Sequence, residues 1–123
     1  MTRVLFVCPQ NADRSQVAQA FYERRGGDAR SAGTAPAPEL LPVVVDALAE
    51  LGIDVSGRTP QALSGVELEW ADLVVTMGCA DACPVLPGTA YLEWQVADPA
   101  GLCLEEAREL CSAIEQRVAA LPL

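Results

Sequence analysis

Hydrophobic and polar residues follow one another along this chain in blocks that predict strands and helices in turn. Four stretches have the length and apolar character of short strands: residues 3–8, 29–32, 72–77 and 90–94. The runs at 3–8 and 72–77 are continuous rather than alternating, which is typical of parallel strands buried on both faces. The last stretch is expected to lie at an edge of the sheet.

Apolar residues at helical spacing predict three helices, over residues 15–25, 40–51 and 104–121. A short helix through Leu68 also fits the pattern. The apolar stripe of the middle helix runs from Leu41 to Leu51, and Gly52 ends it. Because strands alternate with helices, we predict an open parallel α/β sheet that binds ligands beyond the carboxyl ends of its strands.

The size and composition of the chain predict one globular domain over residues 1–123, since 51% of the residues are hydrophobic. No apolar run approaches the roughly 20 residues that a membrane helix needs, and no secretion signal opens the sequence. We therefore expect a cytoplasmic monomer without a membrane partner.

The charged residues and the cysteines limit the binding partners and the catalytic groups that this chain can have. There are 17 Asp and Glu against 8 basic residues, all of them Arg, and the net charge of -9 disfavours binding to nucleic acid. The absence of His and Lys excludes histidine-based nucleophile activation, the HExxH zinc site, Schiff bases and a Walker A lysine. The 5 Cys are more typical of reactive, metal-binding or packing thiols than of structural disulfides.

The loop after the first strand carries the strongest candidate chemistry. Cys8 precedes Arg14 by six residues, and the segment between them joins a strand to a helix N-terminus. Backbone N–H groups in such a loop converge on a tetrahedral oxyanion, and an arginine fork matches two of its oxygens. We predict that the oxyanion-binding residues are Gln10, Asn11, Ala12, Asp13, Arg14 and Ser15.

The reactivity of Cys8 depends on its surroundings in this loop. Arg14 and the helix N-terminus are expected to lower the thiol pKa and hold a thiolate, to which Ser15 can hydrogen-bond. Asn11 suits a left-handed turn. A lone Cys at the end of a buried strand is more often a packing residue, but Arg14 and Ser15 at these spacings favour a nucleophile.

Two further cysteines, Cys79 and Cys83, follow the third strand and share an edge of the sheet with Cys8. One helical turn would bring their Cα atoms within about 6 Å, which a disulfide can span. Zinc is the alternative, but Cys103 and Cys111 form no second closely spaced pair, so we expect redox chemistry and no metal. We interpret Cys103 and Cys111 as packing residues of the last helix.

Segments from nearly the whole chain resemble the thioredoxin-coupled arsenate reductase family, which has the low-molecular-weight protein tyrosine phosphatase-like fold. In order, the matching segments are FVCPQNADRSQVAQAF, SAGTAP, LGIDVSG, ADLVVTMGCADACPVLPG and ADPAG. The resemblance implies a three-layer α/β fold in which helices flank an open four-stranded parallel sheet.

By this resemblance, the chain is an enzyme that reduces arsenate to arsenite, a reaction of arsenic detoxification. Cys8 would attack arsenate, Asp98 would protonate the departing oxygen, and Cys79 would attack Cys8 to release arsenite. Cys83 would then attack Cys79, and thioredoxin or a low-molecular-weight thiol would reduce the final disulfide without a bound cofactor. Phosphate or sulfate could occupy the loop in place of arsenate.

Alternatives remain for the activity and for Asp98. Asp98 precedes Pro99 near Trp94, where apolar surroundings would favour a protonated carboxyl, but an Asp-Pro turn without a catalytic role is also common. The chain could instead be a low-molecular-weight tyrosine phosphatase, or an oxyanion- or arsenite-binding protein without turnover. Against the phosphatase, ester hydrolysis needs no resolving thiols, and the DPAG turn lacks the tyrosines that phosphatases usually carry there.

Three residues depart from the pattern of the reductases. Gln10 stands where many members have Gly or His, and Gln19 replaces a Glu that some members use for potassium, so we expect no potassium site. Asp13 stands where the reductases usually have Gly or Cys. Its carboxylate can point into the site, repel the anion and raise the Cys8 pKa, or it can pair with a cation, of which Arg14 is the nearest candidate.

Overall fold

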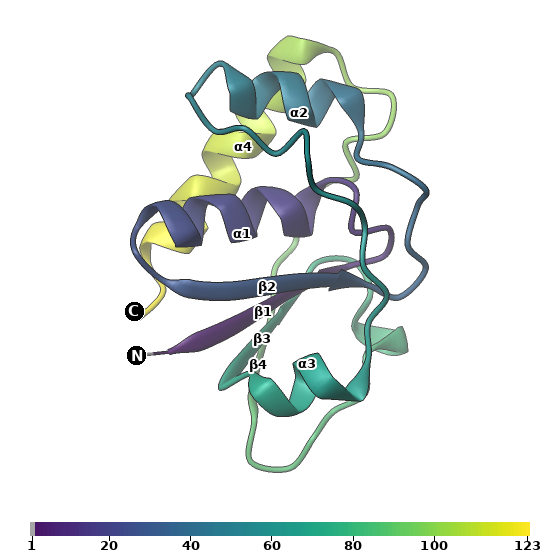
Figure 1. The fold of residues 1–123 in the computed structure, drawn as a ribbon, viewed down its shortest axis with the longest axis vertical. Coiled ribbons are helices and arrows are strands. Elements are labelled where there is room, and N and C mark those ends of the chain that lie inside the picture. Colours follow the sequence, from purple (N-terminus) through teal and green to yellow (C-terminus); the bar gives the residue numbers. More distant parts are fainter. Residues whose placement is uncertain (1) are drawn as a thin grey trace.

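A sheet of four parallel strands forms the centre of the molecule, and the computed structural model describes residues 2–123. In chain order the strands are β1 (Arg3–Cys8), β2 (Asp28–Gly33), β3 (Leu73–Thr76) and β4 (Ala90–Glu93). Their order across the sheet is β2-β1-β3-β4, with β4 at an edge as expected (Figure 1). The predicted open parallel sheet is therefore confirmed.

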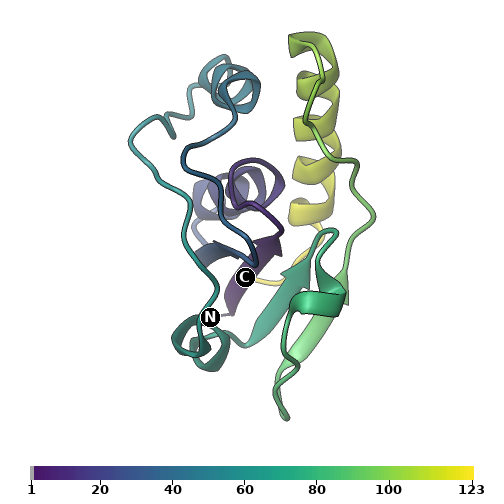
Figure 2. The ribbon, with the colours of Figure 1, turned by 90° about the vertical axis from the view of Figure 1, so that its right-hand side faces the viewer.

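Helices cover both faces of this sheet and give the fold three layers (Figures 1 and 2). They are α1 (Arg14–Arg24), α2 (Pro42–Ala49), α3 (Gly65–Trp70) and α4 (Leu104–Ala119). The helices α1, α2 and α4 lie on one face, and α3, the short helix through Leu68, lies on the other. None of the helices within residues 2–123 is both long and apolar enough to cross a bilayer.

Alternate residues of β1 belong to two different cores. Val4, Phe6 and Cys8 pack with residues of α1, α2 and α4, whereas Leu5 and Val7 pack in a smaller core with Leu68 of α3. Burial on both faces explains the continuous apolar run of this strand. It also turns the Cys8 side chain towards the face that carries α1.

Two expectations about apolar positions are wrong. The middle helix ends before Leu51, which is 47% exposed, because Gly52 takes a left-handed φ of 78° and turns the chain away. Cys103 is exposed at the N-cap of α4, where its backbone N–H donates to the Glu106 carboxylate at 3.2 Å. Only Cys111 packs in the core as predicted.

The two ends of the chain lie side by side, at the end of the sheet where β1 begins (Figure 1). Near the end of α1, Arg25 Nη1 donates to the backbone carbonyls of Val118 at 2.6 Å and Leu121 at 3.1 Å. The Tyr22 hydroxyl donates to the carbonyl of Pro122. The last residues are thus tied to the end of α1 that is remote from the Cys8 loop.

Candidate active site

The carboxyl end of β1 continues into residues 8–15, which we call the anion loop. The carbonyl oxygens of Pro9, Gln10 and Ala12 accept hydrogen bonds of 2.7–3.0 Å from backbone N–H groups within residues 35–41. In a trans peptide the C=O and N–H groups point in opposite directions. Since the three carbonyls point towards residues 35–41, the N–H groups of the same peptides point to the opposite side of the loop. The loop therefore presents the kind of donors that an oxyanion needs.

Asn11 holds the loop in shape, and its φ of 50° confirms the expected left-handed turn. Its Nδ2 donates to Ser15 Oγ at 2.7 Å, and its Oδ1 accepts from the backbone N–H of Gln61 at 2.8 Å. The buried Gln16 adds two bonds, from Nε2 to Asn11 Oδ1 at 3.1 Å and to the Asn11 carbonyl at 3.2 Å. The loop is thereby joined to α1 and to the segment before α3.

The Cys8 thiol is fully buried, and its Sγ lies 3.0 Å from Ser15 Oγ, as expected. Burial is the largest influence on the Cys8 pKa and raises it, and the negative charge of Asp13 raises it further. Hydrogen bonds from Ser15 and from the backbone at Asn11 act in the opposite direction but do not outweigh them. The expectation that Arg14 and the helix end would hold Cys8 as a thiolate is therefore wrong.

Asp13 points into the site rather than towards solvent, since only 2% of the residue is exposed. It is the N-cap of α1, and its Oδ1 accepts from the Arg14 backbone N–H at 2.5 Å. The same oxygen lies 3.4 Å from Arg14 Nε and 3.5 Å from Cys8 Sγ. Because Arg14 Nη1 also donates to the Val96 carbonyl at 3.3 Å, the guanidinium is engaged on two sides.

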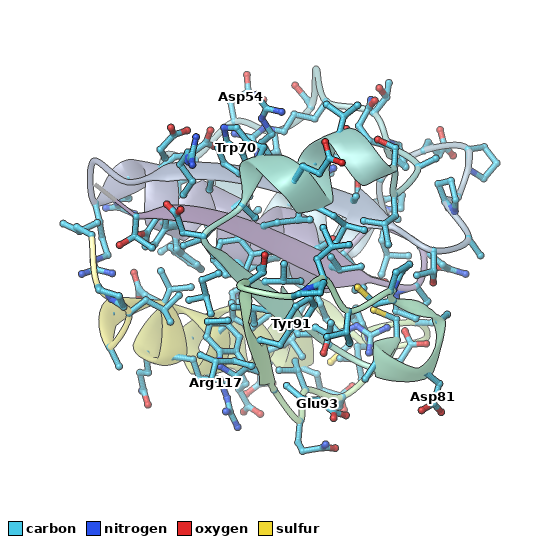
Figure 3. The ribbon with its side chains drawn as sticks, turned by 90° about the horizontal axis from the view of Figure 1, so that it is seen from below. Asp54, Trp70, Asp81, Tyr91, Glu93 and Arg117 are labelled. Atoms are coloured by element: carbon cyan, nitrogen blue, oxygen red, sulfur yellow. The ribbon has the colours of Figure 1, made fainter. Side chains whose placement is uncertain are left out.

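The loop after β3 brings Cys79 to the anion loop. Gly78, with a φ of 84°, lets this loop pass so close to Arg14 that a Cβ there would lie 3.0 Å from Arg14 Nη1. Cys79 and Pro9 line one cavity of about 330 Å³, and its other lining residues include Asp81 and Glu93, which lie at the same edge of the molecule in Figure 3.

A 3-10 turn over Ala80–Ala82 separates Cys79 from Cys83 in place of the expected α-helical turn. Both thiols are buried and free, and they pack in the smaller core with Val7. The short turn keeps the two cysteines in one compact loop next to the anion loop. No group of three or more His, Cys, Asp or Glu side chains within residues 2–123 is arranged to hold a metal ion.

Burial raises the pKa of Cys79 to about 11, and the nearby Cys83 and Cys8 add to this shift. Alkylation of Cys79 by iodoacetamide is therefore expected to be slow at pH 7. Its rate should rise about tenfold per pH unit towards pH 11, because the thiolate is the reactive form. Peptide mass mapping across a pH series measures this, with the exposed Cys103 as an internal reference. A Cys79 alkylation rate that does not rise between pH 7 and pH 10 would contradict it.

The surroundings of Asp98 differ from those that the sequence predicts. The residue is exposed, and its Oδ1 accepts from the Ala100 backbone N–H at 2.9 Å, which is the geometry of a turn starter. The expected apolar surroundings are absent at this carboxyl. Its distance from Val96 along the chain is nevertheless only two residues, and the Val96 carbonyl holds Arg14.

Comparison with known proteins agrees with this geometry. Residues 3–122 match the family described as low molecular weight phosphotyrosine protein phosphatase. The chain belongs to this family. Relatives with this fold carry the names of two kinds of enzyme, arsenate reductases and a phosphatase.

A Halobacterium salinarum protein named as a candidate arsenate reductase is 39% identical over an alignment of 125 positions, which covers 95% of this chain and 88% of the relative. The thioredoxin-dependent arsenate reductase of Corynebacterium glutamicum is 36% identical with a TM-score of 0.84, over 97% of this chain and 59% of that chain. An arginine phosphatase of Geobacillus stearothermophilus is 25% identical and has a TM-score of 0.84. The match covers 97% of this chain and 89% of that chain. The predicted resemblance and fold are thus confirmed.

Sequence reasoning missed three residues that shape the loop of this family member: Gly33, Gln16 and Gln61. Gly33 pairs with Cys8 in the sheet, and a Cβ there would lie 2.8 Å from the Pro9 carbonyl oxygen and 2.9 Å from the Asn11 nitrogen. The glycine directly after the second predicted strand was the available signal for such a close approach. Nothing in the sequence pattern pointed to Gln16 or Gln61.

Gly33→Ala is accordingly expected to displace the anion loop. The new methyl group meets backbone rather than a flexible side chain, so the phosphate Kd should rise about tenfold and the free energy of unfolding should fall by about 1–3 kcal/mol. Calorimetric titration and urea unfolding measure the two effects. Gly65→Ala is the control, since its Cβ would meet open space. Wild-type phosphate affinity in Gly33→Ala would contradict the expected displacement.

Proposed function

We propose that this chain is an enzyme that reduces arsenate to arsenite with its own thiols. The observation that carries the proposal is that Pro9 of the anion loop and Cys79 line the same cavity, where Gly78 lies against Arg14. A thiol in the anion loop, with a second thiol near enough to feel its charge, suits a reaction that bonds arsenic to sulfur and then forms a disulfide. The names of the relatives support the same activity.

In the first step, Cys8 Sγ bonds to arsenic and one As–O bond breaks. The N–H groups of the anion loop and Arg14 would hold the remaining oxygens. Asp98 is the proposed acid that protonates the departing oxygen, which then leaves as water. Asp98 lies two residues after Val96, whose carbonyl accepts a hydrogen bond from Arg14, which supports a place for its exposed carboxyl near the loop.

In the second step, Cys79 Sγ attacks Cys8 Sγ and the S–As bond breaks. The bonding electron pair stays with arsenic, so As(V) becomes As(III) while two thiols become a disulfide. Cys83 then attacks Cys79, which frees Cys8 and leaves a Cys79–Cys83 disulfide. The short turn between the two cysteines supports this exchange, because such a bond requires closely spaced Cα atoms.

Thioredoxin or a low-molecular-weight thiol is the proposed electron donor, and no bound cofactor is required. The thioredoxin dependence named for the Corynebacterium glutamicum neighbour supports the first of these. A cycle that ends in a disulfide needs a reducing compartment, which agrees with the expected cytoplasmic location. Since Cys8, Arg14, Cys79 and Cys83 all come from one chain, we propose that it works as a monomer.

Hydrolysis of a phosphate ester is the second candidate, favoured by the family match. It would use the first half of the mechanism, with Cys8 as nucleophile and Arg14 on the phosphoryl oxygens. Cys79 and Cys83 would then have no chemical role. Their burial beside the anion loop as free thiols is the reason to prefer reduction.

The test is to incubate the protein with arsenate, thioredoxin, thioredoxin reductase and NADPH, and separately with p-nitrophenyl phosphate. We expect arsenite and matching NADPH oxidation, and little ester hydrolysis. Ester hydrolysis without arsenite would assign the protein to the phosphatases. Binding of oxyanion with neither product would indicate a binding protein.

A further inference from the structure

A buried carboxylate lies beside the thiol that the proposed reaction uses. Asp13 Oδ1 is 3.5 Å from Cys8 Sγ, within the range of a hydrogen bond donated by a thiol, and the residue is 2% exposed. Capping of α1 accounts for the bond between Asp13 and the Arg14 backbone. A cap could be made by Ser or Asn without placing a negative charge against the nucleophile. The contact with sulfur therefore calls for another role.

The other polar groups around Cys8 cannot take its proton. Ser15 Oγ accepts from Asn11 Nδ2, so its hydroxyl proton is free to donate to sulfur. Arg14 has only donors. Cys79 remains a thiol at neutral pH, because its pKa is about 11 and Cys83 beside it raises that value. With no His or Lys in the chain, Asp13 is the one base in contact with the Cys8 thiol within residues 2–123.

We propose that Asp13 is a catalytic residue that accepts the thiol proton of Cys8 while the sulfur attacks the oxyanion. This assignment rests on the proposed function for the identity of that oxyanion. As the S–As bond forms, the S–H bond breaks and its proton moves to Asp13 Oδ1. The As–O bond breaks at the far side, and arsenic remains As(V) in this step. Asp13 returns its proton to solvent after arsenite leaves.

The proton transfer from Cys8 to Asp13 is feasible if it occurs while the S–As bond forms. A carboxylate is a weaker base than a thiolate, so proton transfer alone runs uphill. Sulfur loses its basicity as it bonds to arsenic, so a transfer concerted with attack avoids a free thiolate next to two other negative charges. The same carboxylate repels the incoming anion. Asp13 thus weakens the binding of arsenate, which raises KM, and assists the attack by Cys8, which raises kcat.

The experiment replaces Asp13 by Asn, which keeps an oxygen for the Arg14 backbone but is not a base. We expect kcat for arsenate at pH 7 to fall about 100-fold while the apparent KM also falls. The alkylation pKa of Cys8 should fall but stay above its ordinary value, because burial is the larger cause of its shift. Between pH 6 and 9, kcat should rise with pH in Asp13→Asn and stay nearly flat in the wild type.

Two controls make the result specific. Asp13→Ser retains a helix cap and should behave as Asp13→Asn, whereas Asp72→Asn removes an exposed carboxylate that pairs with Arg3 and should behave as wild type. A kcat that is unchanged, raised, or lowered equally at every pH in Asp13→Asn would overturn the proposal.

Failure of arsenate reduction itself is recognised separately, because the wild type would then form no arsenite. In that case the same variants are compared in the formation of the phosphocysteine intermediate from p-nitrophenyl phosphate, since attack by Cys8 is common to both reactions. The same pH-dependent loss would support the role of Asp13, and its absence would overturn it.

Discussion

Cys8→Ser is expected to lower arsenate turnover by more than about 1,000-fold while the variant still binds oxyanion. A serine hydroxyl is a far poorer nucleophile than a thiol, and a carboxylate such as Asp13 is too weak a base to activate it at neutral pH. The backbone donors and Arg14 are unchanged by the substitution, so the phosphate Kd should stay close to that of wild type. Arsenite assays and calorimetric titration with phosphate measure the two properties.

Cys103→Ser is the matched control, because it removes an exposed thiol at the cap of α4. It should retain full turnover. Substantial arsenite formation by Cys8→Ser would exclude Cys8 as the nucleophile and direct attention to Cys79. Loss of phosphate binding together with turnover would instead show that the substitution had disturbed the loop.

Cys83→Ser is expected to stop the cycle after a single turnover. Cys79 can still attack Cys8 and release one arsenite, but the resulting disulfide has no resolving thiol within the chain. Peptide mass mapping after one equivalent of arsenate should therefore find Cys8 joined to Cys79. Continued turnover with thioredoxin should be lost, because the reductant would have to reach a disulfide that includes the fully buried Cys8.

Wild type is compared in the same experiment and should accumulate the Cys79–Cys83 disulfide when thioredoxin is omitted. Cys8 joined to Cys83 in wild type would reverse the proposed order of the two thiols. A disulfide to Cys111 would contradict the proposed use of Cys79 and Cys83, because the Cys111 thiol of α4 is buried in the core.

Local sequence signals predicted much of the fold and part of the site. The buried run of β1, the helix that follows it and the left-handed Asn11 are consequences of residues close together in the chain. The contact between Ser15 and Cys8 also follows from their spacing across one loop. Such features depend on periodicity and backbone preference, which a single sequence records.

Features set by distant residues could not be predicted in the same way. The engagement of Arg14 by the Val96 carbonyl joins residues 82 positions apart. The raised pKa of Cys8 depends on burial and on the inward direction of Asp13, and only the packed loop determines both. The burial of Asp98 and of Cys103 was misjudged because turns and helix caps remain exposed even when apolar residues flank them in the sequence.

The hydrogen bonds between the end of α1 and the last residues of the chain have a practical consequence. Arg25 and Tyr22 hold residues 118–122, and β1 starts beside them, so both termini emerge opposite the anion loop. A surface linker or a fluorescent reporter attached at either terminus would leave the mouth of the cavity facing solution. Immobilised protein of this kind should therefore retain access for both a small oxyanion and a bulky protein reductant.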